Sequence, residues 1–237
     1  MDRKSSQESK LSREQIRNLY RNDYVQDFEK THKIRLSRLI PLMNLQHDDY
    51  VADFGCGNGM LMDLIHDKIG FYNGIDFSQE FINAAKRRKN LLSIKNASFF
   101  CESIKDFCAR HPQTFDKAFA MDLSEHIYDE DWLVITRAIR TSLKLSKDGI
   151  FYLHTPNKGF VIESMKNKGI IRQFPEHIAV RNTHHNINLL KQSGFSRVKV
   201  IYLPHYLGQL AWLHYFTKLP VVGKYFKARL FFECSLF

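Results

Sequence analysis

Short apolar runs alternate with segments of helical periodicity from residue 50 to the end of the chain. Apolar runs bounded by glycine or polar turns predict strands. Their alternation with helices predicts an α/β fold, in which a mostly parallel sheet carries helices on both faces. We expect strands at residues 50–54, 71–77, 97–101, 115–121, 150–155, 195–203 and 228–236, and helices at 11–43, 60–69, 79–89, 131–145 and 183–192.

The chain length fits one large domain preceded by a helical segment. Of the 237 residues, 44% are hydrophobic and 25% are charged, which is ordinary for a packed globular protein and argues against disorder or a coiled coil. We expect a helical N-terminal cap at residues 1–44, bent by Pro41, and an α/β domain at 45–237. Ligands of such sheets bind beyond the carboxyl ends of the strands, so we expect site residues directly after each strand.

The cysteines and the start of the chain bear on the compartment. Cys56, Cys101, Cys108 and Cys234 have no spacing typical of a zinc site, so we expect free thiols in a reducing compartment. The first ten residues are polar and lack the apolar run of a secretory signal. We therefore expect a cytoplasmic protein.

A glycine-rich turn follows the first predicted strand. Behind Asp53, three glycines alternate with other residues at Gly55, Gly57 and Gly59, and the turn leads into a predicted helix. Glycine permits a tight turn and close approach of a ligand to a helix N-terminus. The third glycine comes one position earlier than in the GxGxxG fingerprint, which argues against a pyrophosphate ligand and a dehydrogenase. Asp76 ends the second strand, where a carboxylate can accept both hydroxyls of a ribose.

These motifs resemble those of class I S-adenosylmethionine-dependent methyltransferases. The segments that carry the resemblance are VADFGCGNG, GIDFS, FDKAFAMDLSEHI, SKDGIFYLHTPN and the helix that ends in QSGFSRVKV, which together cover about residues 45–203. The resemblance implies a Rossmann-like, seven-stranded, mostly parallel sheet with an antiparallel C-terminal hairpin. It also implies S-adenosylmethionine as the cofactor. The motifs are most similar to the small-molecule O-methyltransferase branch that includes the ubiquinone-pathway enzymes.

The resemblance also implies a set of cofactor contacts. The glycine turn with Asp53 would hold the methionine part, and Asp76 would hold the ribose, with Phe77 against the adenine. The third strand ends in an acid one position earlier than in many relatives, so the adenine contact stays open between Glu102, Ser103 and the Ile104 backbone. The implied cofactor-binding residues are Asp53, Gly55, Cys56, Gly57, Gly59, Asp76, Phe77, Ser78, Glu102, Ser103, Ile104, Met121 and Asp122.

The loop after the fourth strand holds the candidates for chemistry. His126 is our first choice for a base that takes a proton from the acceptor, because histidine has an ordinary pKa of about 6.5. Glu125 could orient it, and His154 after the fifth strand faces the expected acceptor side, as does Asn157. The alternative is that His126 only caps a helix or bonds a buried carbonyl.

A second interpretation of the same loop is that it binds a divalent cation. Asp122, Glu125, His126 and Asp129 offer oxygen and nitrogen ligands, and some similar ubiquinone-pathway enzymes with an E-H-x-x-D stretch use such an ion. The metal question stays open at this point. His177, His184 and His185 are more simply explained as structural residues.

Positive charge is concentrated in the last third of the chain. The net charge is +10, and residues 158–237 hold twelve basic and three acidic residues. This bias favours an anionic partner, although a solvated basic face would look the same. The insert at 204–227 is aromatic and basic. We interpret it as a lid over the acceptor, a segment that lies on an anionic membrane, or a core helix.

The function we predict is methyl transfer to a small-molecule acceptor, acidic or hydrophobic and in one reading lipid-linked, with oxygen favoured as the methylated atom. One alternative is an RNA methyltransferase that uses the basic last third as a phosphate track. Nucleic acid is the weaker partner, because the fourth strand lacks the Asn/Asp-Pro-Pro-aromatic loop common among base-modifying relatives. Another alternative is a catalytically silent module that only binds the cofactor.

Overall fold

The computed structural model describes residues 33–237 apart from 146–148, 173, 175 and 207. Most of the predicted N-terminal helix and most of the turn predicted at 146–149 therefore lie outside the described residues. All seven predicted strands are present, with ends that differ from the prediction by at most two residues. They are β1 (Tyr50–Phe54), β2 (Phe71–Asp76), β3 (Ala97–Cys101), β4 (Lys117–Met121), β5 (Ile150–Pro156), β6 (Arg197–Leu203) and β7 (Arg229–Ser235).

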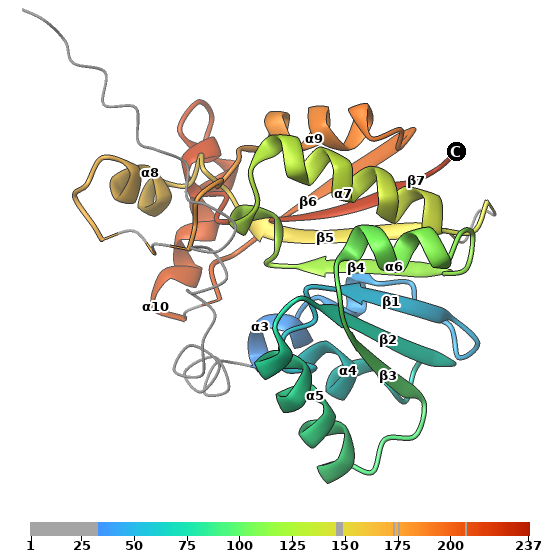
Figure 1. The fold of residues 1–237 in the computed structure, drawn as a ribbon. Coiled ribbons are helices and arrows are strands. Elements are labelled where there is room, and N and C mark those ends of the chain that lie inside the picture. Colours follow the sequence, from blue (N-terminus) through green and yellow to red (C-terminus); the bar gives the residue numbers. More distant parts are fainter. Residues whose placement is uncertain (1–32, 146–148, 173, 175, 207) are drawn as a thin grey trace, which may run out of the picture.

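The strands form one sheet in the order β3-β2-β1-β4-β5-β7-β6 (Figure 1). Strands β1 to β5 run parallel, and β7 runs antiparallel to both β5 and β6. The order reverses between β1 and β4, so the edge beyond their carboxyl ends is where a ligand of such a sheet binds. The α/β class, the parallel sheet and the antiparallel C-terminal hairpin are confirmed.

The helices connect successive strands, and two short ones were not predicted. Helices α6 and α8 span seven residues each, which is too short for a clear helical period. Ser78 caps α5 as predicted, because its hydroxyl accepts the amide of Phe81 at 3.3 Å. The helices are α3 (Lys33–Ser37), α4 (Met60–Ile65), α5 (Gln79–Leu91), α6 (Ile104–Arg110), α7 (Asp129–Ser142), α8 (Val161–Asn167), α9 (Thr183–Gln192) and α10 (Gly208–Ala211), with 3-10 turns η1 (Ile40–Leu42), η2 (Ser124–His126), η3 (Trp212–Lys218) and η4 (Gly223–Phe226).

The sheet separates two apolar cores. Side chains of successive strand residues point to opposite faces, so Phe119 packs with α3, α4 and α5 while its neighbours Ala118 and Ala120 pack with α6, α7 and α9. Figure 1 shows the second group of helices lying together along β4, β5 and β7. The four cysteines are free thiols, as predicted.

The connection between β6 and β7 lies at the carboxyl edge of the parallel strands. Leu203, which ends β6, pairs with Arg229, which begins β7, and Arg229 also pairs with Pro156 at the end of β5. The connection contains α10, η3 and η4, and none of the seven residues of η3 is buried. This exposure does not match a core helix. Among the described residues, no helix is both long and apolar enough to cross a membrane.

Phe119 offers a test of the sheet core. Its ring is fully buried in the middle of β4 and stacks on Tyr152 of β5, with ring centroids 5.6 Å apart. Replacement Phe119→Ala should lower the free energy of unfolding by about 3–5 kcal/mol, because it leaves a cavity between strand and helices. Urea unfolding measures the change. The control Leu91→Ala, at a side chain that is 85% exposed, should stay within about 0.5 kcal/mol of the wild type; equal losses in both variants would contradict the assigned core.

Candidate active site

The glycine turn after β1 and the acid that ends β2 meet directly. Gly55, Gly57 and Gly59 all have positive φ angles, of 72°, 51° and 72°, which few other residues adopt. The Gly57 amide donates to one carboxylate oxygen of Asp76 at 3.1 Å, and the Ser78 amide donates to the other at 2.9 Å. The Asp76 side chain therefore holds the glycine turn by accepting a hydrogen bond from the backbone amide of Gly57. Burial raises the pKa of Asp76 to about 6 although these amides oppose the shift.

Asp53 lies beside this turn with one carboxylate oxygen unpartnered. The hydroxyl of Tyr72 donates to its Oδ2, whereas Oδ1 is buried and no described residue bonds it. Burial raises the pKa of Asp53 to about 7, despite the hydrogen bond from Tyr72. Both amide atoms of the buried Asn58 side chain also lack a partner among the described residues. Buried polar atoms of this kind are expected where a polar ligand completes the hydrogen bonding.

The residues expected near an adenine lie at the ends of β2 and β3. The Phe77 ring is 41% exposed and so can meet another ring. Glu102 forms an ion pair with Arg110, and the Ser103 hydroxyl caps α6 by accepting the Asp106 amide at 3.1 Å. The side chains of Glu102 and Ser103 are thus engaged within the protein.

Asp122, directly after β4, lies in a network of cations. It has a left-handed backbone with φ of 57° and contacts Arg229, while its Oδ2 lies 3.1 Å from Arg35 Nε and its Oδ1 lies 2.9 Å from His154 Nδ1. Burial alone would raise the pKa of Asp122, but the charges of Arg229 and Arg35 outweigh it and hold the pKa well below its usual range. Its carboxylate is therefore committed to these cations.

His154 is buried between Asp122 and Arg229. Its Nε2 faces the Arg229 Nε at 3.4 Å. Burial and the nearby guanidinium of Arg229 lower the pKa of His154, although Asp122 opposes the shift. The imidazole is therefore neutral near pH 7. Asn157, which the sequence also placed on the acceptor side, instead donates to the Lys227 carbonyl at 2.7 Å and so fixes the start of β7.

The loop after β4 brings three possible ligand atoms together. Atoms of Glu125, His126 and His177 lie within 4.8 Å of one another. His126 directs Nδ1 at the Glu176 carbonyl oxygen at 2.8 Å, which can only accept, so Nδ1 carries a proton. Burial, together with the proximity of His126, lowers the pKa of His177 to about 3. His177 could not be selected from sequence spacing, because fifty residues separate it from His126.

Two acids expected in this loop as metal ligands lie elsewhere. Asp122 belongs to the arginine network, and Asp129 accepts from Arg181 Nε and His185 Nε2, both at 2.7 Å. Only Glu125 and His126 of the four predicted candidates join the cluster. Burial raises the pKa of Glu125, with a further contribution from the charge of Asp122. The Thr155 hydroxyl donates to the Glu125 carboxylate at 3.1 Å, and the Nδ1 of His177 is buried without a described partner.

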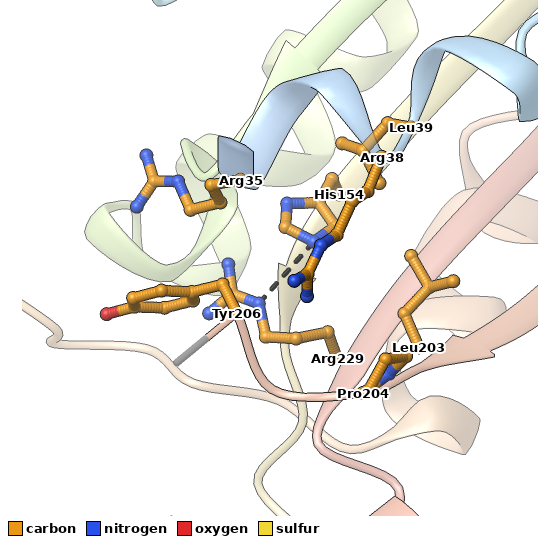
Figure 2. Close-up of a pocket in the computed structure, with 8 residues that line it drawn as sticks. All are labelled: Arg35, Arg38, Leu39, His154, Leu203, Pro204, Tyr206 and Arg229. Carbon is orange, nitrogen blue, oxygen red and sulfur yellow. Dashed lines mark hydrogen bonds between the residues drawn. The ribbon is translucent and has the colours of Figure 1, made fainter. Parts of the chain in front are cut away.

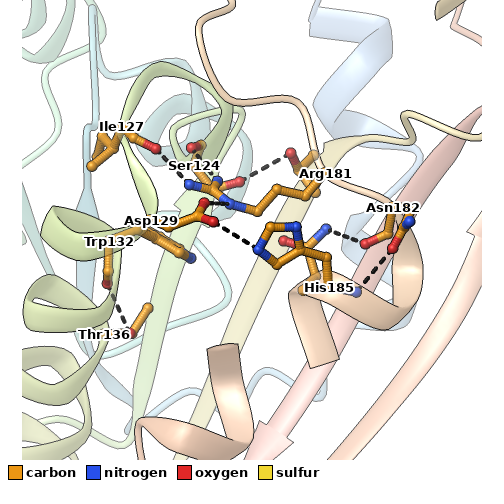
Figure 3. A network of polar contacts seen from close by, with 10 residues as sticks. Ser124, Ile127, Asp129, Trp132, Thr136, Arg181, Asn182 and His185 are labelled. Atoms are coloured by element: carbon orange, nitrogen blue, oxygen red, sulfur yellow. Dashed lines mark hydrogen bonds and ion pairs between the residues drawn. The ribbon is translucent and has the colours of Figure 1, made fainter. Parts of the chain in front are cut away.

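Arg181 holds the loop in place (Figure 3). Its buried guanidinium donates to the carbonyls of Ser124 at 2.7 Å and Ile127 at 2.6 Å, and to Asp129 at 2.7 Å. These carbonyls flank Glu125 and His126, so Arg181 sets the position of both side chains. Sequence reasoning missed this residue, because a buried arginine among carbonyls leaves no local pattern.

The loop also touches the glycine turn. A Cβ placed on Gly55 would lie 2.8 Å from a methyl carbon of Leu123, which precedes η2 by one residue. The side chain of Leu123 therefore packs on the turn, and only glycine leaves room for it. The expected cofactor residues and the expected catalytic residues thus share one edge of the sheet.

Comparison with known proteins gives the family. Residues 45–214 match the methyltransferase domain family. The ubiquinone biosynthesis O-methyltransferase of Xanthomonas campestris pv. campestris is 30% identical over 146 residues, which are 60% of this chain and 57% of that enzyme. The chain thus spans little more than half the length of this relative.

Solved structures share the fold. A SAM-dependent methyltransferase from Archaeoglobus fulgidus superposes with a TM-score of 0.65 at 16% identity, covering 89% of this chain and 97% of that one. A putative methyltransferase from Haloferax volcanii, solved with the Trm112 activator, gives 0.67 at 18% identity, covering 93% and 97%. The chain therefore belongs to the methyltransferase domain family and has the fold of S-adenosylmethionine-dependent methyltransferases.

Proposed function

We propose that this protein transfers the methyl group of S-adenosylmethionine to an oxygen atom of a small acceptor that is hydrophobic or acidic. The observation that carries the proposal is the contact between the glycine turn and the loop of Glu125 and His126, through Leu123 on Gly55. The name of the Xanthomonas relative supports oxygen as the methylated atom. The cofactor, when bound, supplies a methyl group on a sulfonium sulfur, and the protein has to orient the acceptor and take its proton.

The unpartnered polar atoms fit the cofactor. Asp53 Oδ1 suits the methionine ammonium, because this oxygen is buried and no described group donates a hydrogen bond to it. Asp76 can accept the ribose hydroxyls, and the exposed Phe77 ring can lie against the adenine. Since Glu102 and Ser103 are engaged with Arg110 and α6, we assign the adenine contact to the backbone N–H of Ile104, which begins α6 and can donate to a ring nitrogen.

Cofactor affinity should depend on the ionisation of Asp76. Ribose hydroxyls donate to the carboxylate and favour its charged form, and the pKa of about 6 lies well above the usual value. Affinity for S-adenosylhomocysteine should therefore fall as the pH drops from 8 to 5.5, by up to tenfold per pH unit once below the pKa. Calorimetry measures the affinity, with circular dichroism to confirm the fold.

The variant Asp76→Asn should bind about 10- to 100-fold more weakly at pH 8, because a hydrogen bond to a charged group is lost. The exposed control Asp67→Asn should bind like the wild type. Wild-type affinity for Asp76→Asn would exclude the ribose role.

We assign His126 as the base that takes the acceptor proton. Its Nδ1 points at the Glu176 carbonyl, its ring lies near the buried Glu125, and Arg181 fixes the loop that carries both residues. His154 is the second candidate, as a neutral imidazole backed by Asp122, although its Nε2 faces the Arg229 guanidinium. A hydrogen bond from that guanidinium would occupy the lone pair, which favours His126.

The variant His126→Gln should lose about 100- to 10,000-fold in turnover with unchanged affinity for S-adenosylhomocysteine. Release of S-adenosylhomocysteine with a catechol probe such as 3,4-dihydroxybenzoate measures turnover. The exposed control His47→Gln should keep full activity. Unchanged turnover in His126→Gln would exclude the base role, and cofactor binding without turnover on any phenol, catechol or RNA would indicate a silent binding module.

A divalent cation is the second candidate for the same cluster. Glu125, His126 and His177 would hold it, because their possible ligand atoms lie within 4.8 Å of one another and the buried His177 Nδ1 has no described partner. Such an ion would polarise a catechol-type hydroxyl. Loss of turnover after treatment with a chelator, restored by Mg²⁺, would favour this role over the base.

The insert favours peripheral contact with an anionic membrane. Exposed aromatic and apolar side chains lie close to three lysines at 218, 224 and 227. Trp212 is 54% exposed, Tyr215 84% and Val221 84%. Aromatic rings with neighbouring lysines suit the interface of a bilayer.

The double variant Trp212→Ser/Tyr215→Ser should lose flotation with vesicles that contain an anionic lipid, because it removes the apolar anchor. The control Leu91→Ser removes a side chain that is 85% exposed on α5 and should float like the wild type. Absence of lipid-dependent flotation of the wild-type protein would exclude the membrane contact.

A further inference from the structure

A small pocket at the carboxyl edge of the sheet is rich in arginine (Figure 2). It lies where the N-terminal helical region, β5 and the β6–β7 hairpin meet, and its empty volume is about 320 Å³, including solvent at its mouth. His154 and Arg229 bring it to β5 and β7, which lie beyond β4 as seen from β1 and the glycine turn. The lining residues are Arg35, Arg38, Leu39, His154, Leu203, Pro204, Tyr206 and Arg229.

The pocket has an excess of positive charge. Three of its lining side chains are arginines, and among the described residues none of the eight that line it is acidic. Asp122 behind the pocket pairs with Arg229 and Arg35, but one carboxylate cannot balance three guanidinium groups. Arg38 is exposed, and no described acidic side chain forms an ion pair with it. Burial lowers the pKa of His154, so this residue adds no charge of either sign near pH 7.

The remaining wall is aromatic and apolar. The Tyr206 ring lies between two guanidinium groups, with ring-centre distances of 5.8 Å to Arg35 and 5.9 Å to Arg229. Leu39, Leu203 and Pro204 complete the lining. A wider hollow beside His177 differs in kind, since Asp129 and Glu130 share it with Lys158 and Arg181. Of these two hollows among the described residues, the arginine pocket is the one that combines an unbalanced positive charge with an apolar wall.

We propose that this pocket binds an oxyanion, a carboxylate or a phosphate, that the methyl acceptor carries on an apolar body. Arginine presents a planar set of donors that fits both groups, and the apolar wall would contact the carbon skeleton. The inference rests on the proposed function and narrows its acceptor to anionic compounds. Arg38 forms no ion pair with a described acidic side chain, so its guanidinium can donate to the bound anion. Arg229 and Arg35, in contrast, also pair with Asp122.

The competing occupant is the carboxylate of the cofactor itself. For Arg229 the strand order argues against it, because β4 and β5 separate β7 from β1 and the glycine turn. Arg35 and Arg38 need a direct test, because α3 packs on α4, the helix that follows the glycine turn. The experiment therefore uses protein already saturated with S-adenosylhomocysteine. An anion that binds this complex occupies a site other than that of the cofactor carboxylate.

Calorimetry of this complex in phosphate-free buffer should detect benzoate or phenyl phosphate, which stand for the two anions, and not the uncharged benzamide. Binding of the anion should be about 10- to 100-fold weaker in Arg38→Gln and partly retained in Arg38→Lys. It should also weaken as salt is raised, because the charge is near the surface. The matched control Arg197→Gln, at the opposite end of β6, should bind like the wild type.

The proposal is overturned if neither anion binds the complex, if benzamide binds as well as the anions, or if Arg38→Gln binds like the wild type with S-adenosylhomocysteine affinity intact. It is also overturned if the anions bind only in the absence of S-adenosylhomocysteine. These outcomes leave the proposed methyl transfer standing. A wild-type protein that does not bind S-adenosylhomocysteine would instead contradict the proposed function itself.

Discussion

The carboxylate of Asp122 is buried at the end of β4, where two guanidinium groups and one imidazole from three separate parts of the chain meet it. Arg35 comes from the helix before the sheet, His154 from β5 and Arg229 from the last strand. A buried carboxylate without cations would be strongly destabilising, so each of these segments is tied to the strand next to β1. The same contacts fix two of the three arginines of the pocket. The position of the acceptor side relative to the cofactor side therefore depends on this one group.

The fold could be predicted from the sequence to a large extent, because the sheet is built from short-range patterns. Apolar runs bounded by glycine or polar turns located all seven strands, and Ser78 marked the start of α5 correctly. The missed helices α6 and α8 span seven residues each, so their buried residues do not repeat often enough to show a helical period. The exposure of η3 was also unpredictable, since an aromatic segment reads equally well as core.

Some residues of the candidate site belong to sequence motifs and could be predicted, whereas others come together only when the chain folds. Gly57 and Asp76 belong to motifs that follow neighbouring strands, and the structure joins them by a hydrogen bond. Tyr72, Arg181 and His177 reach the site through packing between distant elements. Asn58 lay within the glycine motif and was passed over, since nothing in the motif shows that its amide is buried. Of the residues expected in the loop, Asp122 and Asp129 are held by arginines that sequence spacing could not have located.

The antiparallel course of β7 has an evolutionary consequence. Since Leu203 and Arg229 are paired neighbours, the chain between them leaves and re-enters the sheet at the edge where we propose that the acceptor binds. Insertions and deletions between these two positions leave every strand register unchanged and remodel only the rim above the reaction centre. New acceptors can therefore be acquired through this hairpin while the cofactor half of the enzyme is preserved.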